Sequence, residues 1–401
     1  MSSRIFREPP SPLQPDLRSK WLLDPRITFL NHGSFGAVPR VVFEEQAQWR
    51  RRIEAEPIEL LGRQAGALIE AAKQPIGAWL GMRADDFGFV TNATEGVNAV
   101  LHSLTLNPGD ELLTTNHVYP AVRQAMRNIA ARSQAAYREV ALNPPFESPR
   151  QIGAAVLNAI APATRLLVID HITSPTAIVF PVETITTECA KRGIDVLVDG
   201  AHAPGMLPLD VAAIGATYYT GNLHKWPCAP KGAAFLWVAP DRQKAVHPLI
   251  ISHFLGEGFA KEFSWQGTRD ISAWLTAPRA VAFMADLGWD RIRAYNHNLA
   301  VWAQRLLCDE WGVAALSSVD GQMIGSMATI PLPAPLDRLT TLQSLQLQQW
   351  LYNEHHIEVP VTCWNGRTHL RPCCQIYNEA AEYERLGKVI AQMEEHHFSE
   401  L

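Results

Sequence analysis

One carboxylate and one amine follow two short apolar runs in the middle of the chain. Asp199 comes directly after the β-branched run 194–198, and Lys225 follows the run 216–219 and the polar stretch 220–224. Apolar runs of this length, bounded by glycine and proline, favour buried strands over helices, and open α/β sheets bind ligands at the carboxyl ends of their strands. We therefore expect Asp199 and Lys225 to face one ligand site.

An amine and a carboxylate in one site suit a ligand that carries an aldehyde and a pyridine ring. A lysine amine forms a Schiff base with pyridoxal phosphate, and a carboxylate keeps the pyridine nitrogen protonated so that the ring accepts electrons. Each residue alone also has an ordinary role, because an aspartate after a strand is often a helix cap and a lysine before a tryptophan is often a surface charge. Together they indicate pyridoxal phosphate as the cofactor and Lys225 and Asp199 as catalytic residues.

The sequence around these residues resembles the class V aminotransferase family of fold-type-I pyridoxal-phosphate enzymes, and within it the isopenicillin N epimerase-like branch. The resemblance runs from about Phe29 to the end of the chain. It implies an α/β fold: a large domain with a mostly parallel sheet flanked by helices, and a smaller α+β C-terminal domain. It also implies that Thr220, Asn222 and His224 contact the cofactor and that His202, a catalytic residue, orders Asp199 or the phenolic edge of the ring. The residues that carry it are Asp199-Gly200-Ala201-His202 and Thr220-Gly221-Asn222-Leu223-His224-Lys225-Trp226.

A helix start after the expected strand 87–90 is the candidate phosphate site. The turn and helix 91–101 bring small residues to a helix N-terminus, where free N–H groups and the helix dipole favour a phosphate. Threonine followed by glutamate also makes an ordinary helix start. The resemblance to the family's Ala-Thr-Glu turn implies that Ala93 and Thr94 contact the phosphate.

Two further loops match positions that contact the cofactor ring in class V enzymes. After the expected strand 112–115, the resemblance places Tyr119 over the pyridine ring, with His117 as the alternative. A core aromatic with a hydrogen-bonded hydroxyl is the ordinary role for Tyr119. After the strand 165–170, Ser174 or Thr176 is expected to hydrogen-bond the phenolic oxygen of the ring.

The segment 264–270 resembles one that reaches the cofactor phosphate of the partner subunit. Thr268 is the donor in this comparison, and a local turn with a cap is the ordinary alternative. The resemblance therefore implies a homodimer with shared active sites.

Two segments are expected to contact the substrate, a small-molecule amino acid. The run 30–36, Leu-Asn-His-Gly-Ser-Phe-Gly, resembles a turn of the epimerase-like branch, which implies substrate contacts for Asn31, His32 and Ser34; a surface turn is the alternative. Arg371 is in register with the family's arginine for the substrate α-carboxylate, and a planar guanidinium suits that bidentate task. The two residues after Arg371 depart from the family pattern, and a structural salt bridge is its rival role.

The reaction implied by the resemblance starts with removal of the Cα proton by Lys225, and we expect epimerisation. A class V aminotransferase or a cysteine desulfurase or C–S lyase is the alternative, and no residue is singled out as the acid for the opposite face. A desulfurase uses a loop cysteine, but Cys363 lies too close to Arg371 in sequence for such a loop. A binding protein without cofactor would be expected to lack Lys225 or Asp199.

Length and composition bound these expectations. The 401 residues suit a large domain with a smaller companion, and we predict an N-terminal arm at 1–28, a large cofactor domain at 29–277 and a small domain at 278–401 that packs with the arm. A net charge of −5 argues against nucleic-acid binding.

The six cysteines lack paired spacings, which indicates a reduced compartment and no metal site. Without an apolar leader or membrane-length run, we expect a cytoplasmic protein without membrane contact.

Overall fold

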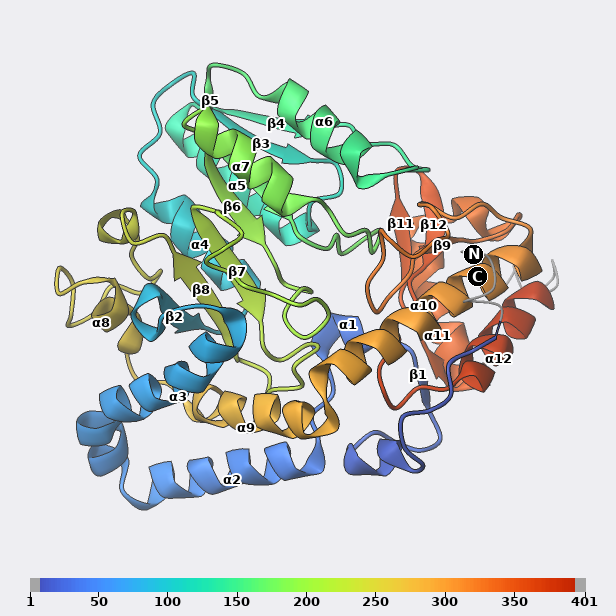
Figure 1. The fold of residues 1–401 in the computed structure, drawn as a ribbon, viewed down its shortest axis with the longest axis horizontal. Coiled ribbons are helices and arrows are strands. Elements are labelled where there is room, and N and C mark those ends of the chain that lie inside the picture. Colours follow the sequence, from blue (N-terminus) through green and yellow to red (C-terminus); the bar gives the residue numbers. More distant parts are fainter. Residues whose placement is uncertain (1–7, 394–401) are drawn as a thin grey trace.

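A large and a small domain lie side by side in the computed structural model, which describes residues 8–393 (Figure 1). The parts of the expected arm and small domain at 1–7 and 394–401 lie outside the described residues. A mostly parallel sheet with helices on both faces forms the large domain, and a smaller mixed domain carries the C-terminal part of the chain. The predicted fold class is confirmed.

The central sheet has the strand order β2-β8-β7-β6-β5-β3-β4. Strand β8 pairs antiparallel with both of its neighbours, and the remaining pairs are parallel. Parallel neighbours bring their carboxyl ends to one edge, which is where the expected site residues follow the strands. The strands are β2 (Phe87–Val90), β3 (Glu111–Thr115), β4 (Ala136–Val140), β5 (Thr164–Asp170), β6 (Asp195–Asp199), β7 (Tyr218–Asn222) and β8 (Ala234–Val238).

Both faces of the sheet are buried, which explains why its strands read as continuous apolar runs. In β6, Val196 and Val198 point into one core, whereas Leu197 points into the other. The first core is closed by α2 (Arg40–Ala55), α3 (Ala65–Leu80), α6 (Pro149–Ala159), α7 (Val182–Lys191) and α9 (Ser272–Leu287). The second is closed by α4 (Ala93–Ser103), α5 (Pro120–Ser133) and α8 (Phe259–Ser264).

The small domain is built around a separate core. Three antiparallel strands in the order β11-β12-β9 pack with long helices, and the parallel pair β1-β10 joins the N-terminal segment to them. Its elements are α10 (Trp289–Trp311), β9 (Ile330–Pro331), α11 (Thr341–His355), β10 (Ile357–Glu358), β11 (Val361–Trp364), β12 (Arg367–Leu370) and α12 (Ala380–Ala391), joined by β1 (Thr28–Phe29).

The cores divide the chain differently from the predicted boundaries. The boundary after residue 277 falls inside α9, where Val281 still belongs to the large-domain core and Met284 belongs to the small-domain core. A continuous helix that packs on α2 and α3 carries the chain across. Leu17 and Trp21 of the arm belong to the small-domain core, and β1 pairs with β10 although Phe29 was assigned to the large domain.

None of the helices between residues 8 and 393 combines the length and hydrophobicity needed to cross a lipid bilayer.

Candidate active site

A cavity of about 460 Å³ lies at the carboxyl ends of β5, β6 and β7. The last residues of these strands, Asp170, Asp199 and Asn222, contribute to its wall. The sheet therefore brings together side chains that are far apart in sequence. Other side chains in the wall are Ser34, Phe35, Thr94, Tyr119, Ser174, His202, His224, Lys225 and Lys231.

The amine of Lys225 lies within the cavity and has a reduced affinity for its proton. Its Nζ is 3.1 Å from Nε2 of His202. Burial, and after it the Arg371 cation, lower the pKa of Lys225 to about 7, although the Asp199 carboxylate acts in the opposite direction. A large fraction of this amine is therefore neutral near pH 7, which is the form that attacks an aldehyde.

Asp199 is a buried carboxyl group at the end of β6, as expected. The Ala201 N–H donates to its Oδ1 at 3.0 Å. Burial raises the pKa of Asp199, and the Ala201 hydrogen bond and the Lys225 cation both oppose that rise. Such a group matches a ligand that brings a cationic N–H, as a protonated pyridine does.

His202 contacts the amine of Lys225 and makes no hydrogen bond with Asp199. Burial holds the pKa of His202 well below its ordinary value, so the ring is neutral. Its Nε2 faces Lys225, and Nδ1 is buried without a hydrogen-bond partner among residues 8–393. The described structure thus shows no hydrogen bond by which His202 would order Asp199, and the alternative contact with the phenolic edge of the ring stays a prediction.

The N-terminus of α4 presents Thr94 to the cavity, whereas the N–H of Ala93 is already used. The Ala93 N–H donates to Oδ1 of Asn222 at 2.8 Å, and Asn92 caps the helix by accepting from the Glu95 N–H at 2.9 Å. The Thr94 hydroxyl has no hydrogen-bond partner in the described part of the chain and lines the cavity. Thr94 thus fits the predicted phosphate contact, and Asn222 holds the turn in place.

Of the two other expected cofactor contacts in the segment before Lys225, His224 faces the cavity and Thr220 does not. His224 lines the cavity, and its Nδ1 bonds the Ala233 carbonyl at 3.2 Å, which leaves Nε2 for a ligand. Thr220 does not line the cavity; its hydroxyl donates to the Phe235 carbonyl at 2.8 Å. Gly96 packs against Thr220 so closely that a Cβ there would overlap its side chain, so Thr220 sets how near α4 approaches β7.

Tyr119, and not His117, reaches the cavity. Tyr119 is the N-cap of α5, lines the wall and is 40% exposed. His117 is fully buried, where its Nδ1 bonds the Thr176 hydroxyl at 2.6 Å and its Nε2 bonds the Leu142 carbonyl at 3.0 Å. Thr176 is thereby held in the core, so Ser174 is the member of that pair that lines the cavity.

Arg371 is a buried cation without a carboxylate partner among residues 8–393, which argues against the structural salt bridge. Its Nη1 donates to Oγ of Ser174 at 3.0 Å, its Nη2 lies 3.4 Å from Oγ of Ser34, and its Nε has no partner within the described chain. Burial lowers the pKa of Arg371, yet the group stays charged. Because a buried charge is costly unless it is paired, the site favours an anionic ligand.

Only the distal part of the 31–36 turn faces the cavity. Ser34 and Phe35 line the wall. The Asn31 amide donates to Oε1 of Glu358 at 2.7 Å, and its oxygen accepts from the Ser34 hydroxyl. His32 is fully buried, in the short helix α1 (His32–Phe35), between the Tyr377 hydroxyl and the Lys225 carbonyl. Asn31 and His32 therefore support the site from behind and do not line it.

Two more sequence expectations concern residues outside the cavity. Thr268 is exposed and lies beyond the cavity wall of its own chain. Cys363 lies on β11, with its Sγ 3.0 Å from the Ser344 hydroxyl and 3.1 Å from the Leu339 carbonyl. Cys363 is not part of the cavity wall. Residues 8–393 contain no group of three or more potential metal ligands.

Asp170 and Lys231 line the cavity, and the sequence analysis assigned them no role. Asp170 ends β5 and pairs in register with Asp199, so two carboxyl groups stand side by side. Burial raises the pKa of Asp170 well above its usual range, and the neighbouring Asp199 charge adds to this. The sequence could have indicated Asp170 as a site residue, because two neighbouring parallel strands, β5 and β6, both end in aspartate.

Known proteins resemble this chain over most of its length. Residues 31–342 match the family model "Aminotransferase class-V". The chain is 32% identical over 391 residues to isopenicillin N epimerase of Streptomyces clavuligerus, covering 94% of this chain and 97% of that protein. It is also 30% identical over 402 residues to L-cysteine desulfhydrase of Arabidopsis thaliana, covering 92% of this chain and 88% of that protein.

Solved structures share the fold. The cystine C–S lyase C-DES, in complex with cysteine persulfide, superposes with a TM-score of 0.78 at 22% identity over 92% of this chain and 98% of that chain. A cysteine desulfurase from Thermococcus onnurineus NA1 superposes with a TM-score of 0.79 at 16% identity over 96% of this chain and 99% of that chain.

Proposed function

The chain belongs to the class V aminotransferase family, and on this premise we propose that it is a pyridoxal-phosphate enzyme that acts on the Cα of an amino acid. The observation that carries the proposal is the neighbourhood of Lys225 and Arg371. Lys225, whose pKa is lowered to about 7, lines the cavity, and the buried guanidinium of Arg371 lies behind the wall, next to Ser174 and Ser34, which line it. The Arg371 cation is one of the groups that lower the pKa of Lys225. An α-amino acid supplies the carboxylate that this guanidinium lacks.

The residues present fit the cofactor. Lys225 would hold its aldehyde, Asp199 its ring nitrogen, and Thr94 and His224 its phosphate, with Tyr119 beside the ring. Bound pyridoxal phosphate would supply an aldehyde and a ring that accepts electrons. Among the described residues at this site, the Thr94 hydroxyl has no hydrogen-bond partner, and Nδ1 of His202, Oδ2 of Asp170 and Nε of Arg371 are buried without one, so polar atoms are left over for a ligand.

We assign proton transfer at Cα to Lys225. Its amine has a pKa of about 7, which suits a general base, and the neutral His202 ring, with Nε2 at 3.1 Å, can orient that amine. Arg371 fixes the substrate carboxylate, and Ser34 and Ser174 hold the guanidinium in place. Epimerisation, as named for the Streptomyces relative, is the reaction we favour.

A C–S lyase reaction is the second candidate. Relatives named L-cysteine desulfhydrase are nearly as similar in sequence as those named isopenicillin N epimerase. Both reactions begin with removal of the Cα proton, so the residues above serve either one. The products that are formed from an accepted amino acid distinguish the two reactions.

The test is incubation with a panel of amino acids in deuterated water, followed by NMR and chiral chromatography. The proposal predicts that the α-hydrogen of an accepted amino acid exchanges with the solvent, and that Lys225→Ala abolishes this exchange. Inversion without keto acid supports an epimerase, and release of sulfide from cysteine supports a lyase. A keto acid produced together with pyridoxamine phosphate would indicate an aminotransferase, and no exchange with any amino acid would overturn the proposal.

We also propose a homodimer in which Thr268 reaches the phosphate site of the partner subunit. The exposure of Thr268 outside its own cavity supports this arrangement. The cytoplasmic location expected from the sequence stays a prediction.

A further inference from the structure

We propose that His32 is a positioning residue for Lys225: its ring bridges the Tyr377 hydroxyl of the small domain to the backbone carbonyl of the lysine. The proposal rests on the assignment of Lys225 as the reactive amine. It gives the 31–36 turn a role in placing that amine.

The His32 ring makes one short hydrogen bond on each side. Nε2 lies 2.9 Å from the Lys225 carbonyl oxygen, and Nδ1 lies 2.7 Å from the Tyr377 hydroxyl. A carbonyl oxygen only accepts, so Nε2 carries the proton, and Nδ1 then accepts from Tyr377. Burial lowers the pKa of His32 to about 3, which keeps the ring neutral and this tautomer in place. The Gln375 amide nitrogen is farther from Nε2, at 3.3 Å, and also faces the Cys228 sulfur.

The same turn holds the lysine segment by packing. Gly36 has a φ of 70° and lies so close to the His224 carbonyl that a Cβ there would overlap it. The Lys225 carbonyl accepts a second bond from the Cys228 N–H at 2.9 Å. Since a lysine side chain has many rotamers, a fixed backbone at its root limits where the amine can reach.

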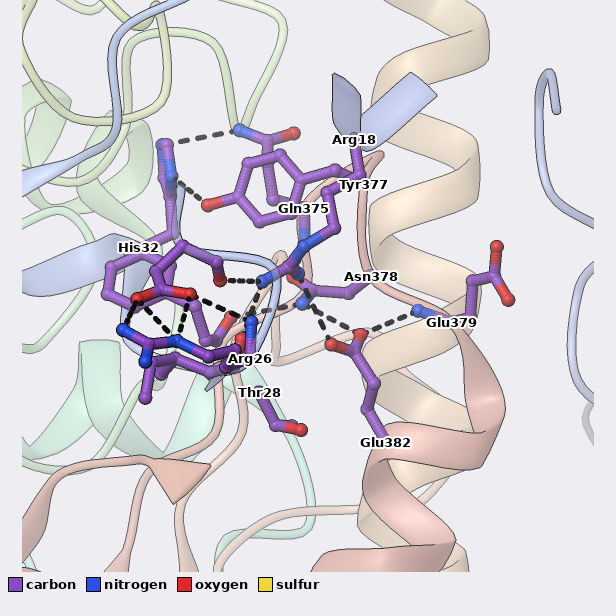
Figure 2. A network of polar contacts seen from close by, with 12 residues as sticks. Arg18, Arg26, Thr28, His32, Gln375, Tyr377, Asn378, Glu379 and Glu382 are labelled. Atoms are coloured by element: carbon purple, nitrogen blue, oxygen red, sulfur yellow. Dashed lines mark hydrogen bonds and ion pairs between the residues drawn. The ribbon is translucent and has the colours of Figure 1, made fainter. Parts of the chain in front are cut away.

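Figure 2 shows the Tyr377 hydroxyl directed at the His32 ring, with the contacts of Arg18, Asn378 and Glu382 nearby. Trp21 packs edge-on against the Tyr377 ring, with centroids 5.1 Å apart. Next to it, Arg18 pairs with Glu382 at 3.4 Å, and the Asn378 amide donates to the Phe29 carbonyl at 3.0 Å. The N-terminal arm and the small domain therefore fix one end of the bridge, and Lys225 lies at the other.

Two amide variants test the hydrogen bonds at the two ring nitrogens of His32 one at a time. In His32→Gln the amide nitrogen takes the place of Nε2 and can still donate to the Lys225 carbonyl. In His32→Asn the amide takes the place of Nδ1, so contact with Tyr377 remains and contact with Lys225 is lost. Tyr377→Phe removes only a hydroxyl. Tyr295→Phe is the matched control, because Tyr295 is equally buried and donates at 2.7 Å to the Asn378 carbonyl without touching His32.

The measurement uses the full chain freed of cofactor and needs no amino-acid turnover. One readout is the rate of pyridoxal phosphate uptake by absorbance. The other is labelling of Lys225 by an amine reagent relative to Lys231, by mass spectrometry. We expect His32→Asn to slow uptake about tenfold, the effect of one lost hydrogen bond. His32→Gln should stay within about threefold of the parent, Tyr377→Phe should fall between, and Tyr295→Phe should match the parent.

Equal rates for the Gln and Asn variants, or a better Asn variant, would overturn the proposal. Equal effects of Tyr377→Phe and Tyr295→Phe on uptake would also overturn the proposal, because Tyr377 would then only stabilise the fold. The comparison of these two isosteric variants tests the proposal even if the His32 variants do not fold. Failure of the parent to process any amino acid while uptake follows the expected order would refute the proposed function and leave the bridge intact.

Discussion

Replacing Arg371 with lysine should weaken substrate binding while leaving the fold intact. Arg371 is 5% exposed, its guanidinium is held by Ser174 and Ser34, and its Nε is buried without a partner in the described chain. Lysine keeps the charge but loses the fork, so one of two charged hydrogen bonds to a substrate carboxylate is lost. Such a bond contributes about 1.5–3 kcal/mol, which corresponds to a rise of about 10- to 150-fold in the dissociation constant.

The assay is a titration of the cofactor-loaded protein with an accepted amino acid, followed by absorbance, together with thermal unfolding of each variant. Arg367→Lys is the matched control, because Arg367 lies exposed at the start of β12, the strand that ends one residue before Arg371, whereas Arg371 is buried against Ser174 and Ser34 of the cavity wall. Unchanged affinity in Arg371→Lys, with a lower unfolding temperature, would refute the reasoning and assign Arg371 a structural role. An equal loss of affinity in Arg367→Lys would refute it as well.

Three other predictions follow from the site. The rate of pyridoxal phosphate uptake by the cofactor-free protein should rise with pH through about 7 and then level off, because the neutral amine of Lys225 is the form that reacts. In Arg371→Gln the midpoint of this rise should move to higher pH, since the cation that lowers the pKa of Lys225 is gone. A midpoint that the substitution leaves unchanged would contradict this electrostatic account. Mixing inactive Lys225→Ala with inactive Thr268→Val under subunit exchange should restore about a quarter of parent activity, because half of the dimers are mixed and each has one intact site; no recovery after proven exchange would show that Thr268 does not act across subunits. Cys363→Ser should leave turnover within about twofold of the parent, as expected of a change outside the site, and loss of sulfide release alone in this variant would instead identify Cys363 as a desulfurase nucleophile.

Much of the site could be predicted from the sequence because it follows strand ends. The runs before Asp199 and Lys225 are apolar enough to indicate buried parallel strands, and such strands bring their carboxyl ends to one edge. The resemblance to the class V family then assigned Thr94 and Tyr119 to the same edge, and the end of the strand beside Asp199 assigned Ser174 or Thr176 to it. Of these residues, the structure places all but Thr176 in the cavity wall.

The errors share one physical cause, which is burial decided by distant parts of the chain. The sequence does not show that His32 faces Tyr377, or that Thr176 turns away toward His117, because the partners are remote in sequence. Nor does it show that the Ala93 N–H is taken by Asn222. The boundary within α9 was missed for a similar reason, since one continuous helix contributes to both cores.

The role of the 31–36 turn is the largest difference between expectation and structure. Its polar and glycine-rich composition suggested a surface turn, and its resemblance to the epimerase-like branch implied contact with the substrate. Gly36 is required instead by the close approach of the turn to His224, and Asn31 bonds Glu358 of the small domain. Only Ser34 and Phe35 keep the predicted position at the cavity.

The identity of the lysine that carries the cofactor tests the account most directly. Two lysines line the cavity wall in the described chain, Lys225 and Lys231, and the account assigns the reactive amine to the first. Borohydride reduction of the cofactor-loaded protein, followed by peptide mapping, should place the pyridoxyl group on Lys225 and should yield none in Lys225→Ala. A pyridoxyl group on Lys231 of the parent protein, or no pyridoxyl peptide at all, would contradict it.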